Sequence, residues 1–308
     1  MSRVRVATYN LYLGADLSLL FRVADLDALA RQVAVVRAQL DATRFAERAG
    51  AVAALLARER PDLVGLQEVS RWVSTGPDGE ERVLADFLST LLEALETAGC
   101  PYDAHARTAA FGGSLPVSGT EWVSLSGANV TLVRRGGPVR VLEEATGTFA
   151  TGYRVVTGIE GVTFPIERGW GRVDVRADGR PLRFVNTHTE AYDGPVRAKQ
   201  RDEVLAATGD ADVPVVLVGD LNAGPDTVGM PAGWTDAWTR GTGDGFTNGQ
   251  AADLANETSM LRERIDYVWV RGGEVLSARV LGDRLEDRTS PHRLWPSDHA
   301  GVVADLEV

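Results

Sequence analysis

The sequence has few of the residues that build disulfide scaffolds, zinc sites or membrane spans. Its 308 residues include one cysteine and four histidines, so an intramolecular disulfide framework is excluded. We expect Cys100 to be a packing residue at a helix end. No apolar run reaches the ~18 residues of a transmembrane helix, and MSRVRVATYN lacks the apolar core of a signal peptide. We therefore expect a cytoplasmic protein, or a secreted one whose signal peptide has been removed.

Positive charge is also scarce. The formal net charge is −11, and Lys199 is the single lysine among 32 basic residues. This balance argues against broad electrostatic binding to DNA or to an anionic membrane. A local cleft lined by arginine remains compatible with it, and acidic groups gathered around a metal would lower the total charge. Oligomeric state cannot be predicted from these features.

Short apolar runs alternate with helical periodicity along the whole chain, without repeats, low-complexity segments or a linker. We therefore predict a single domain over residues 1–308. Helices are predicted at 20–40, 43–59, 80–98 and 194–207, and strands include 4–13, 63–69, 128–135 and 181–190. Residues 111–122 and 240–250 are predicted to be surface loops, either functional or plain connections.

Polar side chains follow the apolar strands. In VPVVLVGDLN, Asp220 and Asn222 are two positions apart and therefore face the same side of an extended chain. Other strands end in the same way, at Asn10, Glu68, His188, Asp266, Asp298 and His299. Each residue alone could be a turn former, a helix cap or a buried ion-pair partner. Their recurrence indicates a common site.

Carboxylates and amides with few histidines and no cysteine cluster form an oxygen-rich environment, which suits Mg²⁺ or Mn²⁺ better than Zn²⁺. Such an ion commonly binds substrate phosphate oxygens. Hydrolysis of a phosphate ester further needs a positioned water, a general base and groups that stabilise charge on the phosphate oxygens. A histidine oriented by an aspartate suits proton transfer near neutral pH.

These residues and their order resemble the endonuclease/exonuclease/phosphatase superfamily of DNase I-like, metal-dependent phosphoesterases. The similar segments are TYNLYLG, LVGLQEV, NTHTEA, GDLNAGPD, RIDYVWV and SDHAGV, which span nearly the whole chain. The resemblance implies an α+β fold, a four-layer α/β/β/α sandwich of two mixed β-sheets with outer helices. The site would lie along one edge of the sandwich.

The resemblance also implies roles for individual residues. Glu68 would be the metal carboxylate, with Asn10 supporting the metal or a phosphate oxygen and Asp298 as a second carboxylate beside the metal. Asp220 would position or activate the attacking water, and Asn222 would donate to the phosphate.

Two histidines would complete the catalytic group. His299 would be the catalytic imidazole oriented by Asp266, and His188 would contact a phosphate oxygen or protonate the leaving group. The abasic-site endonuclease branch lacks this last histidine and has an aspartate where this chain has Tyr12. Both departures argue against abasic-site repair.

The spacing of 58 positions between Asn10 and Glu68 departs from the family pattern and predicts a helical insertion at about 18–60. Arg134, Arg168 and Arg172 are candidate phosphate contacts, with structural or surface roles as the alternative.

The leading hypothesis is a Mg²⁺-dependent phosphoesterase that cleaves phosphodiesters in nucleic acid or in a sphingomyelin-like lipid. The alternatives are a phosphomonoesterase acting on a nucleotide, inositol or lipid headgroup, and a non-catalytic binding module on the same fold.

Overall fold

The computed structural model describes residues 2–117, 120–160, 163–209 and 212–308. The helices of this part of the chain are α1 (Leu26–Ala42), α2 (Phe45–Glu59), α3 (Phe87–Thr97) and α4 (Gly194–Thr208), with short 3₁₀ turns η1 (Leu17–Leu20), η2 (Ala237–Arg240) and η3 (Leu285–Asp287). None of these helices is long and apolar enough to cross a membrane.

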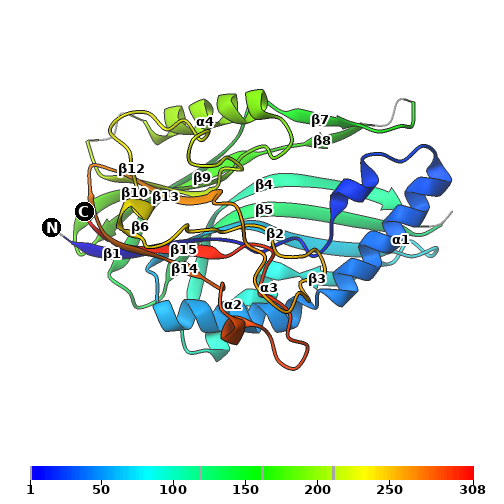
Figure 1. The fold of residues 1–308 in the computed structure, drawn as a ribbon, viewed down its shortest axis with the longest axis horizontal. Helices are drawn as coiled ribbons and strands as arrows, with labels where there is room; N and C mark the ends of the chain where they lie inside the picture. Colours follow the sequence, from blue (N-terminus) through cyan, green and yellow to red (C-terminus); the bar gives the residue numbers. More distant parts are fainter. Residues whose placement is uncertain (1, 118–119, 161–162, 210–211) are drawn as a thin grey trace.

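The strands form two mixed sheets and a separate hairpin (Figure 1). The first sheet has the order β14 (Glu274–Leu281), β15 (Gly301–Glu307), β1 (Arg3–Asn10), β2 (Leu63–Thr75), β5 (Trp122–Arg134) and β4 (Tyr102–Pro116), and β3 (Glu81–Asp86) pairs with β2. The second has the order β12 (Thr235–Asp236), β13 (Asp266–Arg271), β11 (Val215–Asp220), β10 (Arg180–His188), β9 (Gly169–Ala177) and β6 (Val139–Thr148). The hairpin is β7 (Tyr153–Val156) with β8 (Thr163–Ile166).

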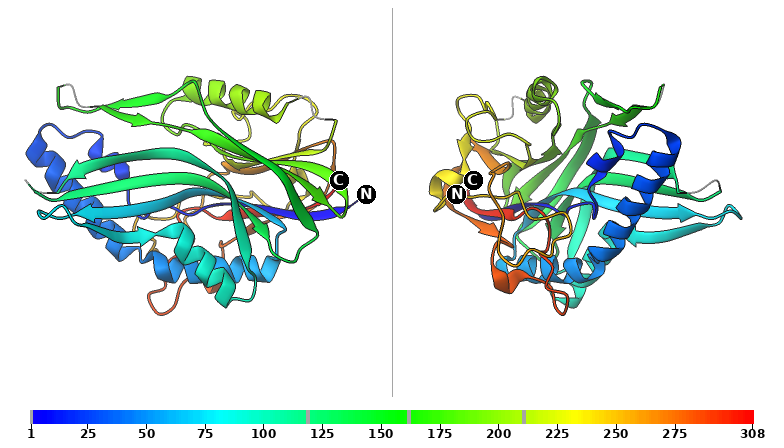
Figure 2. Two further views of the ribbon diagram at one scale, coloured as in Figure 1. Left: turned by 180° about the vertical axis from the view of Figure 1, so that it is seen from behind. Right: turned by 45° about the vertical axis from the view of Figure 1, so that its right-hand side comes forward.

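The layers follow from which faces are apolar. The buried faces of α1, α2 and α3 share one core with the outer face of the first sheet, and Cys100 packs there as predicted. Helix α4 covers the outer face of the second sheet through Val204, which packs against Val185 and Leu217. Figures 1 and 2 show the two sheets between α4 on one side and α2 and α3 on the other. The predicted α+β four-layer sandwich is confirmed.

The inner faces of the two sheets change from apolar to polar along each strand. Val4 and Val6 of β1 lie in the core between the sheets, whereas Thr8 and Asn10 follow on the same face. The same change occurs along β10 (Leu182, Phe184, Asn186, His188), β11 (Val216, Val218, Asp220) and, in reverse, β13 (Val270, Val268, Asp266). The inter-sheet space is therefore a hydrophobic core at one end and a buried polar cluster at the other.

Two predictions of local structure were wrong. Residues 81–86 form β3 and not the first turns of a helix, because they pair with the long extension of β2; Val83 is 54% exposed there. Helix α3 begins after Asp86, whose side chain accepts the Ser89 N–H at 3.1 Å. The predicted 111–122 loop is largely the end of the β4–β5 hairpin, while residues 118–119 lie outside the described part.

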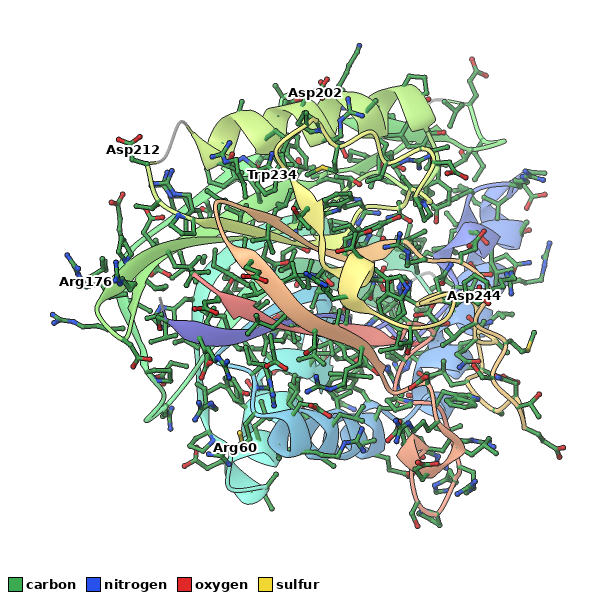
Figure 3. The ribbon with its side chains drawn as sticks, turned by 60° about the vertical axis from the view of Figure 1, so that its left-hand side comes forward. Arg60, Arg176, Asp202, Asp212, Trp234 and Asp244 are labelled. Atoms are coloured by element: carbon green, nitrogen blue, oxygen red, sulfur yellow. The ribbon has the colours of Figure 1, made fainter. Side chains whose placement is uncertain are left out.

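The predicted 240–250 surface loop was also only partly correct. Thr247 is fully buried, and Asn248 bridges to both Glu263 and His299. By contrast with Thr247, charged side chains such as Arg60, Arg176 and Asp202 project outward from the surface of the molecule (Figure 3).

The inter-sheet core gives a direct test of the fold. Leu182 is buried between the sheets and Leu142 is 51% exposed, although both lie on strands of the second sheet. We predict that Leu182→Ala lowers the free energy of unfolding by about 2–5 kcal/mol, since it leaves a cavity. Leu142→Ala should change it by about 0.5 kcal/mol or less. Urea unfolding at matched m-values measures both, and equal losses would contradict this arrangement.

Candidate active site

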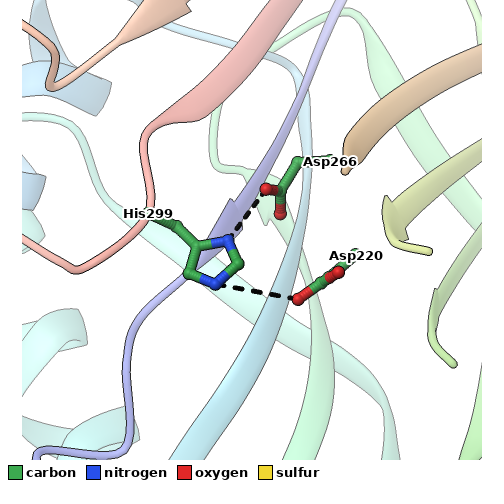
Figure 4. Close-up of side chains that lie close together, drawn as sticks. All are labelled: Asp220, Asp266 and His299. Atoms are coloured by element: carbon green, nitrogen blue, oxygen red, sulfur yellow. Dashed lines mark hydrogen bonds and ion pairs between the residues drawn. The ribbon is translucent and has the colours of Figure 1, made fainter. Parts of the chain in front are cut away.

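The polar end of the inter-sheet space is centred on an aspartate–histidine pair. His299, in the turn before β15, lies with its Nδ1 2.8 Å from Oδ2 of Asp266 at the start of β13 (Figure 4). The backbone on both sides is fixed, because Thr247 Oγ1 accepts the Asp266 N–H at 3.2 Å and Ser297 Oγ accepts the His299 N–H at 3.1 Å. Both side chains are almost fully buried, so the imidazole has a fixed orientation.

The surrounding charges determine the protonation of His299. Burial on its own lowers the pKa of an imidazole, but here the carboxylates of Asp266, Asp298 and Asp220 and the hydrogen bond that His299 donates to Asp266 raise the pKa of His299 well above its ordinary value. The ring is therefore an imidazolium near neutral pH. Its Nδ1–H donates to Asp266, and its Nε2–H is 3.8 Å from Oδ2 of Asp220.

Asp220 lies at the centre of the cluster and contacts most of its members. Its Oδ2 accepts from Asn10 Nδ2 at 3.1 Å and is 3.4 Å from His188 Nε2, while its Oδ1 accepts the Asn222 N–H at 2.9 Å. Burial and the Asp266 carboxylate raise the pKa of Asp220 to about 7, although the His299 cation and these hydrogen bonds oppose the shift. Asp220 can therefore gain and lose a proton near neutral pH.

His188 is neutral, whereas His299 is a cation. Arg168 places Nη1 3.1 Å from His188 Nδ1, and a guanidinium can only donate, so Nδ1 is the acceptor and the ring proton is on Nε2, toward Asp220. Burial, the Arg168 cation and the His299 cation together lower the pKa of His188 well below its ordinary value. The buried Arg168 Nε–H has no hydrogen-bond partner among the described residues.

Glu68 reaches the site through a backbone irregularity. On β2, Gly65 and Gln67 face the inter-sheet space, so regular alternation would turn Glu68 toward the outer helices. The pairing with β5 is interrupted between Leu66 and Val69, and Glu68 has a φ of 54°. This bulge re-aims the side chain, and Oε2 accepts the Leu13 N–H at 2.8 Å. A left-handed backbone at a non-glycine residue is strained, and such strain is typical of functional positions.

Asp298 faces the same region as Glu68. Burial raises the pKa of Asp298 to about 6; the His299 and Arg48 cations oppose the rise and the negative charge of Glu68 adds to it. The side chain is still 24% exposed, at the mouth of a cleft that Glu68 also lines. Together they give a pair of oxygen donors open to solvent.

Arg48 of α2 is a site-supporting residue that was not predicted from the sequence. It is fully buried, and it donates to the carbonyls of Leu11 (2.7 Å), Tyr12 (3.1 Å) and Pro296 (3.1 Å). It thereby joins the chain after β1 to the segment that precedes Asp298. Burial lowers the pKa of Arg48 to about 10, which leaves it charged near neutral pH. Its position three residues after Phe45, on the apolar stripe of a helix, is the signal in the sequence that could have identified it.

A buried amide pair beneath the cluster was missed as well. Gln67 Nε2 donates to Asn186 Oδ1 at 2.7 Å, and Asn186 Nδ2 donates to the carbonyls of Leu66 and Val130, both at 3.1 Å. These bonds cross from the second sheet to the first. They hold the strand ends carrying Glu68 and His188 at a fixed separation.

The three candidate arginines are placed differently. Arg168 belongs to the cluster, as described above. Arg134 forms an ion pair with Asp62 at 2.5 Å, beside the first residue of β2 and away from Glu68. Arg172 pairs with Glu143 at 3.2 Å and Asp174 at 3.5 Å. The structure therefore brings only Arg168 of the three to the polar cluster.

Carboxylates occur in two places where binding of a divalent metal can be considered. Asp220, Asp266 and His299 present ligand atoms within 4.8 Å of one another and could hold an ion. However, the His299 imidazolium and its bond to Asp266 oppose a metal at that point. Glu68 and Asp298 are open oxygen donors, and their mutual repulsion is what a cation relieves. Asn10 connects to this region through its backbone carbonyl, which accepts from Ser297 Oγ at 2.7 Å, and its Oδ1 accepts the Tyr12 N–H at 3.0 Å.

Comparisons with known proteins agree with this geometry. A model of the Endonuclease/Exonuclease/phosphatase family matches residues 7–299, so the chain belongs to that family, whose members are phosphoesterases. A "Putative neutral sphingomyelinase" from Drosophila melanogaster is 25% identical over 161 residues, 46% of this chain and 36% of that protein. The alignment thus spans about a third of this curated relative.

Solved structures show the same fold. Humanized D. rerio TDP2 with 14 mutations has a TM-score of 0.63 at 19% identity, over 100% of both chains. The Bacteroides thetaiotaomicron mannosyl-6-phosphatase has a TM-score of 0.62 at 18% identity, over 99% of this chain and 100% of that one. At this identity the similarity establishes the fold alone.

The two histidines should titrate differently in metal-free protein. We predict that near neutral pH the ring-nitrogen NMR shifts of His299 report an imidazolium and those of His188 a neutral ring with the proton on Nε2. Asp266→Asn should lower the pKa of His299, because it removes the charged acceptor. His292, which pairs with Glu47 at the surface, is the control signal. A neutral His299 at pH 6 would contradict the proposed pair.

Proposed function

We propose that this protein is a Mg²⁺- or Mn²⁺-dependent phosphodiesterase. The carrying observation is the arrangement of one buried aspartate–imidazolium pair, Asp266 with His299, around Asp220, next to the open carboxylates of Glu68 and Asp298. This set combines a proton acceptor, a fixed cation and a site for a divalent ion. A non-catalytic binding module would not require a buried, strained and mutually charged group of this kind.

Glu68 would hold the metal, with Asp298 and Asn10 as its neighbours on the same side of the cluster. When bound, the ion polarises the phosphate and neutralises charge on its oxygens. The choice of Mg²⁺ or Mn²⁺ follows from the all-oxygen donors.

The remaining residues act on the water and the phosphate. Asp220, with a pKa of about 7, accepts a proton from a water held between it and the phosphorus. The His299 imidazolium donates through Nε2–H to a phosphate oxygen and stabilises the charge that develops there. Neutral His188 points its Nε2–H toward Asp220, where it would contact a phosphate oxygen. Its lowered pKa leaves it without the extra proton that a leaving-group acid needs. Asn222 would donate to the phosphate after releasing its bond to the Thr189 carbonyl.

Charge favours a diester over a monoester. A phosphodiester carries one negative charge, whereas a monoester carries close to two near neutral pH. The phosphate would be faced by the cations His299 and Arg168 and by several carboxylates. A phosphomonoesterase acting on a nucleotide, inositol or lipid headgroup is therefore the second candidate. Nucleic acid is the alternative diester substrate, since a structure of D. rerio TDP2 holds a single-strand DNA product.

Metal removal tests the first part of the proposal. We predict that EDTA abolishes hydrolysis of bis-p-nitrophenyl phosphate and that Mg²⁺ or Mn²⁺ restores it. Glu68→Gln should raise the metal concentration needed for half-maximal activity at least about tenfold, because a charged ligand is lost. Glu81→Gln, at an exposed position of β3, is the matched control. Full activity of the chelated wild-type protein would exclude metal dependence.

A double-mutant cycle tests the catalytic pair. We predict that His299→Ala and Asp266→Asn each lower kcat by roughly 10²–10⁴-fold, the usual effect of losing a positioned proton-transfer group. The double variant should be little worse than either single one, since residues that act as a unit are non-additive. The metal requirement of Asp266→Asn should stay close to that of the wild type. Additive losses would show that the two residues act independently.

A further inference from the structure

An apolar cleft opens directly beside the proposed phosphate site. It has a volume of about 340 Å³, and its walls include Glu68, Asp298 and Arg168 at one end. Most of the remaining wall is apolar and includes Leu17, Leu20, Val33, Phe111, Leu125 and Phe164. Ligand pockets commonly have volumes of about 300–1,000 Å³ and a mostly apolar lining with a few polar groups. The cleft therefore has the size and lining of a substrate pocket that continues from the reaction centre.

Segments far apart in the sequence build the cleft. Figure 1 shows η1 and α1, the far ends of β4 and β5, and the β7–β8 hairpin at the same end of the molecule. Leu17, Leu20 and Val33 lie within the stretch that separates Asn10 from Glu68. At the rim, Phe21 and Tyr192 contact edge-to-face with ring centroids 5.2 Å apart. The segment between Asn10 and Glu68 thus provides one wall of the pocket, through η1 and α1.

The charges in the cleft restrict what can enter it. Among the described lining residues, Arg168 is the cation, and Asp16, Glu68 and Asp298 are acidic. A nucleic-acid strand would bring a second and a third phosphate into this acidic and apolar space, where few cations could neutralise them. A substrate with one phosphate beside Glu68 and Asp298 would need few cations. An uncharged apolar group along the cleft would match its mostly apolar wall.

We propose that the cleft binds one long alkyl or acyl group of the substrate, so that the substrate class is a lipid phosphodiester with a single phosphate. This inference rests on the proposed phosphodiesterase function and assigns its specificity. The driving force is transfer of methylene groups from water into the apolar walls, which is about 0.8 kcal/mol for each buried methylene.

A chain-length series tests the proposal. Methyl, butyl, hexyl and decyl p-nitrophenyl phosphate are hydrolysed in Mg²⁺ below their micelle concentrations, and kcat/KM is compared. We expect kcat/KM to rise roughly two- to fourfold per methylene until the cleft is filled. Wild-type hydrolysis of the methyl ester with no dependence on chain length would overturn the lipid proposal and leave the phosphodiesterase standing. Faster cleavage of a single-stranded DNA 12-mer than of the decyl ester would also overturn it.

A substitution that fills the cleft tests whether the dependence of kcat/KM on chain length arises there. Gly113 of β4 pairs with Leu125 and lies between Phe111 and Leu115 on the face that lines the cleft. A Cβ added there meets no atom within 4 Å. Gly113→Trp should therefore abolish the dependence on chain length and retain hydrolysis of the methyl ester. Gly50→Trp, at an equally open position on α2 that lines a different cavity, should keep the wild-type dependence.

Binding separates failure of this inference from failure of the proposed function. Calorimetric titration with monomeric dodecylphosphocholine, in EDTA, needs no turnover. We expect saturable binding to the wild type and to Gly50→Trp, weakened at least about tenfold in Gly113→Trp. Binding without hydrolysis of any ester would reject the phosphodiesterase and support the lipid site. Absence of binding, or equal binding to all three proteins, would overturn the lipid site whatever the activity.

Discussion

The site depends on the electrostatic balance between two buried aspartates and one imidazolium. Asp220 and Asp266 are directly paired across β11 and β13, on the inner face of the second sheet. Burial of two adjacent carboxylates is unfavourable unless a cation or hydrogen bonds compensate them. His299 provides the cation, which enters from the first sheet at the start of β15. The geometry of the polar cluster and the joining of the two sheets at this end therefore have the same physical cause.

Other buried polar groups compensate charges and hydrogen-bonding groups around the polar cluster. Arg48 places a positive charge behind Glu68 and Asp298 and holds the chain segments that flank them through carbonyl groups. Gln67 and Asn186 join the two sheets below the cluster. Buried networks of this kind are stable only when their members are satisfied, and they then rigidify the groups they hold. The apolar cleft lies beside this cluster, and its walls come from η1, α1, β4, β5 and β8.

Local patterns in the sequence predicted the main strands, most helices and the polar strand ends, because alternation and helical spacing report which residues share a face. Residues 81–86 were mispredicted because their apolar spacing also suits a helix, and only pairing with the extension of β2 makes them a strand. Arg48 was missed because charged residues on an apolar helical stripe are usually taken to reach solvent. The single-domain organisation and the status of residues 18–60 as an insertion remain predictions.

The sequence by itself indicated the set of polar strand-end residues, since strand-end positions and residue types are local properties. Its resemblance to a known family implied the four-layer fold, which the structure confirms. Only the tertiary structure decided how these residues are arranged and charged. The bulge at Glu68, the neutral His188 beside Arg168, the charged His299 and the distant positions of Arg134 and Arg172 all depend on partners from remote segments. Charge states and side-chain directions inside a protein are set by burial and by neighbouring charges, and the fold alone brings those neighbours together.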